Sequence, residues 1–269
     1  MRLAAQELLS ILSADTQPLP PAQPNDWRAR HPGEAEQSFA AISKPRNRGI
    51  HANSSLSLYA TPEIESDFPA AITLLAPFLT AYFQISTSGW STIPLDVEAH
   101  DRRNGQTRIR ALLRELPPKT HGQKRLVLTS YDLFPDEADY NFVFGEADYS
   151  DSKAVVSLFR YGIPPRVPLT GVSLIRLLKV TSHEIGHLFA LAHCVAGLCN
   201  MNGVNHTEEL DSHPLDLCPE CLAKWAWFAD SDVSQRLRDL HSFYERHSLH
   251  AERETTACRM ALLNATGNA

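Results

Sequence analysis

Apolar and polar residues follow two different periods between residues 55 and 161. Ser55–Thr61 alternates residue by residue, as a strand does, whereas Ser66–Phe83 repeats its apolar residues at helical spacing. Similar runs predict more of both kinds: strands at Gln84–Leu95, Leu126–Tyr131, Asn141–Gly145 and Ala154–Tyr161, and a helix at Thr107–Leu116. The last two strands are close enough to form a hairpin-like pair. Strands that alternate with helices predict a mixed sheet with helices packed on it.

The second half of the chain is predominantly helical. A loop rich in proline ends near Thr170 or Gly171, where a long amphipathic helix begins that includes Leu174, Leu177 and Ile185 on its apolar face. Three more helices are expected after Cys221: Leu222–Phe228, Val233–His247 with Asp230 or Ser231 as N-cap, and Ala251–Leu263.

Residues 1–50 differ from the rest of the chain. Six prolines between Pro18 and Pro45 break any element longer than a turn or two, although Leu3–Leu12 allows a short helix. We therefore predict two parts: a Pro-rich N-terminal extension over residues 1–50 and one domain over residues 51–269.

Composition and charge exclude some classes of function. A net charge of −6 over 269 residues gives no electrostatic footprint for nucleic acid. No run of about eighteen apolar residues is present that could span a membrane, and the N-terminus lacks the continuous apolar centre of a secretory signal. We expect a cytoplasmic protein, in which paired cysteines bind metal more often than they form disulfides. Cys258 lies apart from the others and is expected to be a buried free thiol.

The long helix carries the segment His183-Glu184-Ile185-Gly186-His187. Two histidines four residues apart project about 40° from each other and can share one ion, and a carboxylate between them completes the parts of a zinc-hydrolase site. His193 follows at the spacing of the extended zinc motif. Three imidazoles would leave one position of a zinc ion open for water, and Glu184 would act as general base in peptide-bond hydrolysis.

His193 can reach this site only if the helix ends before it. A helix that continued would point His193 about 240° away from His187. The extended motif has glycine at the break, where the chain takes a positive φ, but here Ala190 occupies that position. A left-handed alanine costs roughly 1–2 kcal/mol, so either the turn is made differently or the protein absorbs that cost.

A second zinc site is predicted from four cysteines. Cys194 and Cys199 form one pair, and Cys218 and Cys221 form another after a loop of eighteen residues. Four thiolates close the coordination shell, so this zinc would be structural and would hold the chain where His193 must turn. Met201 lies inside the same loop, at the place of the methionine that follows the third histidine in the extended motif.

Non-catalytic alternatives compete with these predictions. Glu184 could be an ordinary helix carboxylate and His193 a solvated loop residue. The main alternative function is a catalytically inactive zinc-binding module for protein recognition, which would keep the cysteine site and lose turnover at the histidine site.

The stretch HEIGHLFALAHC-VAGL-CNM, followed by Cys218-Pro219-Glu220-Cys221, resembles the archaemetzincins, zinc metallopeptidases of the metzincin group. The resemblance implies an α+β fold of the zincin type, with a mixed twisted sheet, an active-site helix and a helical C-terminal part stapled by zinc. It implies two zinc ions, Glu184 as base, and peptides or proteins as substrates. The sequence departs from the family pattern at Ala190 and in a slightly shorter loop after Met201. The resemblance also suggests that Asn141–Gly145 is an edge strand that pairs with extended substrate.

Overall fold

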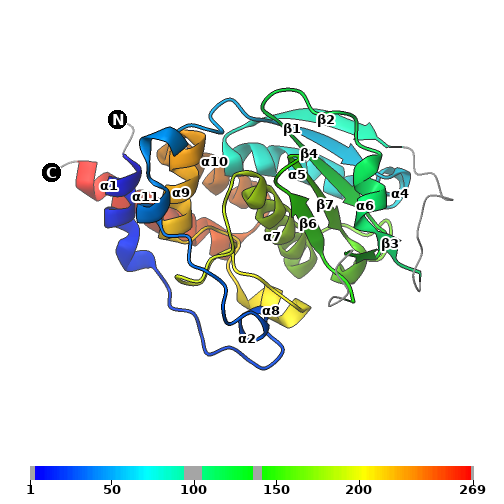
Figure 1. Ribbon diagram of the computed structural model, residues 1–269, viewed down its shortest axis with the longest axis horizontal. Helices are drawn as coiled ribbons and strands as arrows, with labels where there is room; N and C mark the ends of the chain where they lie inside the picture. The colour runs from blue at the N-terminus through cyan, green and yellow to red at the C-terminus, as the bar shows by residue number, and fades with distance from the viewer. Residues whose placement is uncertain (1–3, 94–104, 136–140, 268–269) are drawn as a thin grey trace. The chain divides into compact units, whose positions relative to one another are not determined.

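The computed structural model describes residues 4–93, 105–135 and 141–267 (Figure 1). They form two compact units. The sheet unit comprises Ser54–Leu79 and Ile85–Leu188, and the helical unit comprises Met1–Asn53, Thr80–Gln84 and Phe189–Ala269. The predicted division at residue 50 stays a prediction.

The sheet unit is built on five strands in the order β2-β1-β4-β7-β6. All neighbours are parallel except β6, which runs antiparallel to β7 at the edge. The strands are β1 (Ser55–Ala60), β2 (Ser86–Thr92), β4 (Gln123–Thr129), β6 (Gly145–Asp148) and β7 (Lys153–Ser157). A separate parallel pair joins β3 (Thr107–Arg108) to β5 (Leu133–Phe134). The predicted α+β fold with a mixed sheet is confirmed.

Both faces of β4 are buried, which explains why three consecutive residues in it, Leu126, Val127 and Leu128, are apolar. Val127 of β4 and Val155 of β7 pack with Ile109 and Leu112 of α6 on one face, and Leu126, the neighbour of Val127, points to the other and is also buried. The sheet unit contains α4 (Pro62–Asp67), α6 (Ile109–Arg114), the short η4 (Phe159–Tyr161) and α7 (Gly171–Leu188). Helix α7 contacts β6 and β7 (Figure 1). Helix α5 (Pro69–Phe83) contributes residues to both units.

The helical unit combines the two ends of the chain. Helix α1 packs against α9 and α11, α3 against α9, and α10 against α11. The helices are α1 (Ala5–Leu12), α2 (Trp27–Arg30), α3 (Phe39–Ile42), α8 (Thr207–Ser212), α9 (Pro219–Ala229), α10 (Val233–Arg246) and α11 (His250–Gly267). Two 3-10 turns, η1 (Ser13–Asp15) and η2 (Pro45–Asn47), belong to the N-terminal extension. The extension is therefore packed onto the C-terminal helices.

Several predicted boundaries are wrong for local reasons. The helix predicted over Ser66–Phe83 is divided at Phe68, whose φ of −134° is that of a residue forced out of the helix by the following proline. The helix predicted from Thr107 begins only at Ile109, after β3. The hairpin exists, but its first strand starts at Gly145, where Asn141–Gly145 was expected to end. The predicted strand Gln84–Leu95 extends beyond β2 into residues 94–95, which lie outside the described residues.

Two further predictions in the helical unit are wrong. The N-cap of α10 is Asp232, whose carboxylate accepts hydrogen bonds from the amides of Ser234 and Gln235, and neither Asp230 nor Ser231 has this role. Cys258 is exposed, because the buried face of α11 passes through Thr256, Arg259 and Leu263 instead. None of the helices among residues 4–93, 105–135 and 141–267 combines the length and apolar character needed to cross a membrane.

Candidate metal centres

Helix α7 brings two of the predicted zinc ligands together. The Nε2 atoms of His183 and His187 are 3.0 Å apart, and their rings meet edge to face at a centroid distance of 4.6 Å. Two imidazole nitrogens on one tetrahedral zinc ion lie about 3.3 Å apart. The pair therefore fits a shared ion with little movement.

Glu184 lies between the histidines in sequence and is buried in the sheet unit. Edge strand β6 passes so close that a Cβ atom at Gly145 would lie 2.8 Å from Glu184 Cγ. Burial, and secondarily the like charge of Glu146, raise the pKa of Glu184 to about 8. Both influences disfavour the ionised form of the Glu184 carboxyl, so a nearby cation would stabilise that form.

A lysine that the sequence did not single out terminates α7. Lys124 lies on β4 and is buried, and its Nζ donates a 2.5 Å hydrogen bond to the carbonyl of Leu188, the last residue of the helix. Burial, with a smaller effect of Lys119, lowers the pKa of Lys124 to about 8. A cation at a helix C-terminus satisfies an otherwise unpaired carbonyl and stabilises the helix dipole. The lysine thus fixes the end of the helix that carries both histidines.

The chain turns just after this helix, as the predicted site requires. Ala190 has a φ of 64°, in the left-handed region. The carbonyl of Ala190 accepts a hydrogen bond of 2.9 Å from Gln37 Nε2 of the N-terminal extension. Of the two alternatives, a different turn or an absorbed cost, the structure has the second: alanine itself takes the left-handed conformation, and a side chain from the extension contacts the turn.

Replacing Ala190 by Gly should therefore stabilise the protein. Glycine removes a steric cost of roughly 1–2 kcal/mol and adds unfolded-state entropy, so we expect a net gain of about 0.5–1 kcal/mol in the free energy of unfolding. The measurement is the urea midpoint of Ala190→Gly beside Ala192→Gly, an alanine outside the positive-φ residues. Ala192→Gly should lower the midpoint; an equal drop in both variants would contradict strain at Ala190.

The third predicted ligand, His193, belongs to the helical unit. Its Nδ1 lies 2.6 Å from Glu34 Oε1, and its ring meets the edge of Trp27 at a centroid distance of 4.8 Å. His183 and His187 belong to the sheet unit. The three-histidine zinc site therefore stays a prediction.

The four predicted cysteines converge in the helical unit. All four are buried free thiols whose sulfur atoms lie within 4.8 Å of one another. Cys194 Sγ and Cys218 Sγ are 3.7 Å apart, and four sulfurs on one zinc ion lie about 3.8 Å apart. The amides of Cys218 and Cys221 donate to the sulfurs of Cys199 and Cys218. Such N–H···S bonds stabilise thiolates, so the cluster fits a structural zinc ion.

A buried cation lies beside the cysteines. Lys224 of α9 is 1% exposed, and its Nζ donates to the carbonyl of Gln37. Burial by itself would lower the pKa of Lys224, but the neighbouring sulfurs of Cys221 and Cys194 raise it above its ordinary value. Four thiolates around one Zn²⁺ carry a net charge of −2, so a buried lysine offsets part of that charge.

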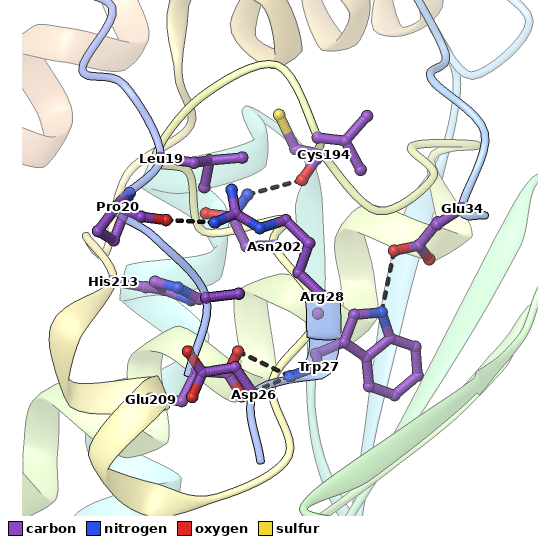
Figure 2. Close-up of a pocket in the computed structure, with 13 residues that line it drawn as sticks. Leu19, Pro20, Asp26, Trp27, Arg28, Glu34, Cys194, Asn202, Glu209 and His213 are labelled. Carbon is purple, nitrogen blue, oxygen red and sulfur yellow. Dashed lines mark hydrogen bonds between the residues drawn. The ribbon is translucent and has the colours of Figure 1, made fainter. Parts of the chain in front are cut away.

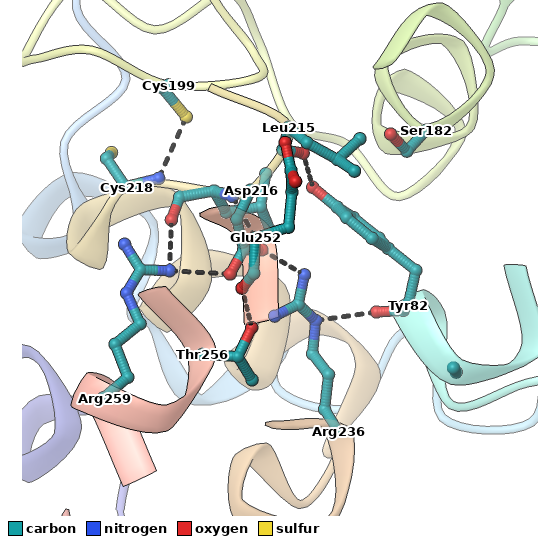
Figure 3. Close-up of polar contacts among 12 residues, drawn as sticks. Tyr82, Ser182, Cys199, Leu215, Asp216, Cys218, Arg236, Glu252, Thr256 and Arg259 are labelled. Atoms are coloured by element: carbon teal, nitrogen blue, oxygen red, sulfur yellow. Dashed lines mark hydrogen bonds and ion pairs between the residues drawn. The ribbon is translucent and has the colours of Figure 1, made fainter. Parts of the chain in front are cut away.

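The loop that leads to the second cysteine pair is held by a buried ion network (Figure 3). Asp216 pairs with Arg236 at 2.5 Å and with Arg259 at 2.7 Å, and Arg259 also donates to the carbonyl of Leu217. Removing one member of a buried charge network typically costs 3–5 kcal/mol. The network therefore fixes the backbone directly before Cys218.

Met201 is fully buried in the same unit. Its carbonyl accepts a 2.8 Å hydrogen bond from the amide of Cys194, the residue after His193. The loop between the cysteines thus returns to the segment that carries the third histidine.

Comparison with known proteins places both candidate centres inside a recognised region. A family model described as Peptidase family M54 matches residues 114–226. Human archaemetzincin-2 is 30% identical over 264 residues, covering 81% of this chain and 71% of the relative. Archaemetzincin from Methanocaldococcus jannaschii is 35% identical over 137 residues, covering 49% of this chain and 73% of the relative. The crystal structure of archaemetzincin from Methanopyrus kandleri, at 27% identity, matches with a TM-score of 0.55 over 67% of this chain and 97% of that one.

Proposed function

The chain belongs to the archaemetzincins, and from that premise we propose that its histidine segment forms the catalytic centre of a zinc peptidase. His183, His187 and His193 would hold the catalytic zinc ion, and the four cysteines would hold a second, structural one. The convergence of two Nε2 atoms beside a buried carboxylate on one helix carries the proposal.

The chemistry divides between metal and protein. Bound zinc would lower the pKa of a coordinated water and polarise the substrate carbonyl. Glu184 would accept a proton from the attacking water and release it to the departing amine. The absence of a side chain at Gly145 leaves room for the Glu184 carboxylate.

Edge strand β6 would align the substrate. Among the residues that the structure describes it is the last strand of the sheet, so its outer edge can pair with an extended peptide by backbone hydrogen bonds. Such pairing needs no particular side chain and favours extended segments over folded ones. The substrate would thus pair with Gly145–Asp148, whereas the sequence suggested Asn141–Gly145.

Metal removal tests the function directly. We expect a zinc chelator to abolish cleavage of a peptide library and stoichiometric zinc to restore it, because the histidine site would need the ion for water activation. Mass spectrometry of the products reports cleavage independently of any dye. If the zinc-loaded protein cleaves no peptide while retaining cysteine-bound zinc, the binding-module alternative would replace this proposal.

A further inference from the structure

The N-terminal extension contacts the third histidine through one carboxylate. Glu34 and His193 are separated by 159 positions in sequence, yet Glu34 Oε1 lies 2.6 Å from His193 Nδ1. When Nδ1 carries the proton and donates a hydrogen bond to a carboxylate, Nε2 keeps its lone pair for a metal ion. His183 and His187 also face each other through Nε2.

Trp27 holds that carboxylate in place. Its Nε1–H donates a 2.9 Å hydrogen bond to Glu34 Oε2 (Figure 2). The two oxygens of Glu34 thus have two different partners, Trp27 and His193. The indole ring also stacks on His31 at a centroid distance of 3.8 Å and meets His193 with its edge. Glu34 is therefore oriented toward Nδ1, with both of its oxygens engaged, and is poorly placed to be a metal ligand itself.

Trp27 is in turn fixed by the loop that follows the third histidine. Its backbone amide donates to both carboxylate oxygens of Glu209, at 2.9 and 3.1 Å (Figure 2). Its ring lies against Gly203 so closely that a Cβ atom there would be 2.4 Å from Trp27 Cδ1. The indole fits only because that residue is glycine.

We propose that Glu34 is a positioning residue for the catalytic centre. Its contact with Nδ1 orients the His193 ring and raises the affinity of Nε2 for zinc. The inference rests on the proposed function and gives the Pro-rich extension a role in it. The extension would complete the metal site by supplying the carboxylate and the tryptophan that aims it.

The test measures zinc bound per chain against free zinc in chelator-buffered solutions, which resolves a tight cysteine step and a weaker histidine step. Glu34→Ala should raise the dissociation constant of the histidine step about 10–100-fold and leave the cysteine step unchanged. Glu34→Gln keeps an acceptor without the charge and should recover part of the affinity. Trp27→Phe, which keeps a ring and removes the donor, should lose part of it. Glu36→Ala alters an exposed carboxylate two residues away and should match the wild type.

The outcomes separate this inference from the function on which it rests. An unchanged histidine step in Glu34→Ala, with the cysteine step intact, would overturn the role of Glu34 and leave the proposed function standing. If Glu34→Ala also loses the cysteine step through misfolding, Glu34→Gln and Trp27→Phe decide, and wild-type affinity in both would overturn the role. A wild-type isotherm that contains the cysteine step alone would overturn the proposed function and this inference together.

Discussion

Glu184→Gln should lower the peptidase kcat by roughly 10²–10⁴-fold, the range that a general base contributes, while zinc remains bound. The amide has the shape of the carboxylate, so its packing against Gly145 is preserved and the histidines keep their places. Only the ability to accept and release a proton is removed. The assay compares initial rates on a peptide substrate, together with zinc per chain.

Glu254→Gln provides the matched control, because it makes the same change at an exposed position of α11. It should retain wild-type rates. Undiminished cleavage by Glu184→Gln, in protein purified free of other peptidases, would remove Glu184 from the mechanism.

Of the substitutions proposed for this protein, Cys194→Ser should lower the free energy of unfolding the most. Serine is a poor zinc ligand, so the structural ion would be lost or weakened, and binding energy at such a site is folding energy. The change would also leave buried Lys224 without part of its countercharge. We expect the free energy of unfolding to fall by roughly 3–5 kcal/mol, the cost of breaking a buried ionic cluster. Urea unfolding followed by tryptophan fluorescence measures it, since Trp225 and Trp227 lie on α9.

The same variant should weaken zinc binding at the histidine site, because Cys194 directly follows His193 in the chain. Cys258→Ser is the control: it alters an exposed cysteine outside the cluster and should change neither stability nor zinc content. A Cys194→Ser protein with wild-type stability would mean that the cluster does not bind a structural ion. Full zinc occupancy of the histidine site in that variant would mean that the two centres bind zinc independently.

Local patterns predicted the elements of the fold better than their ends. The period of two at Ser55–Thr61 and the continuous apolar run near Leu126 correspond to β1 and β4, because burial on one or both faces appears directly in sequence. The start of β6 could not be read from hydrophobicity. Gly145 begins that strand, where the carboxylate of Glu184 leaves no room for a side chain, and that contact joins residues 39 positions apart.

The cysteine cluster could be predicted because its ligands have a characteristic spacing, and the structure brings all four sulfurs together. Glu34 and Lys124 could not, since a single glutamate in a Pro-rich segment and a single lysine on a strand have no pattern. Their roles arise from tertiary contacts to His193 and Leu188. The zinc motif indicated that the chain must break near Ala190, but it left open how, because alanine disfavours the left-handed conformation that the structure has there.

Metal content tests most directly whether the chain binds the two proposed zinc ions. Wild-type protein and His187→Ala are purified in parallel, and zinc per chain is measured by mass spectrometry. We predict two zinc ions per chain in the wild type and one in the variant, because the cysteine site does not use His187. One zinc ion per chain in both proteins would contradict that proposal and leave only the cysteine site.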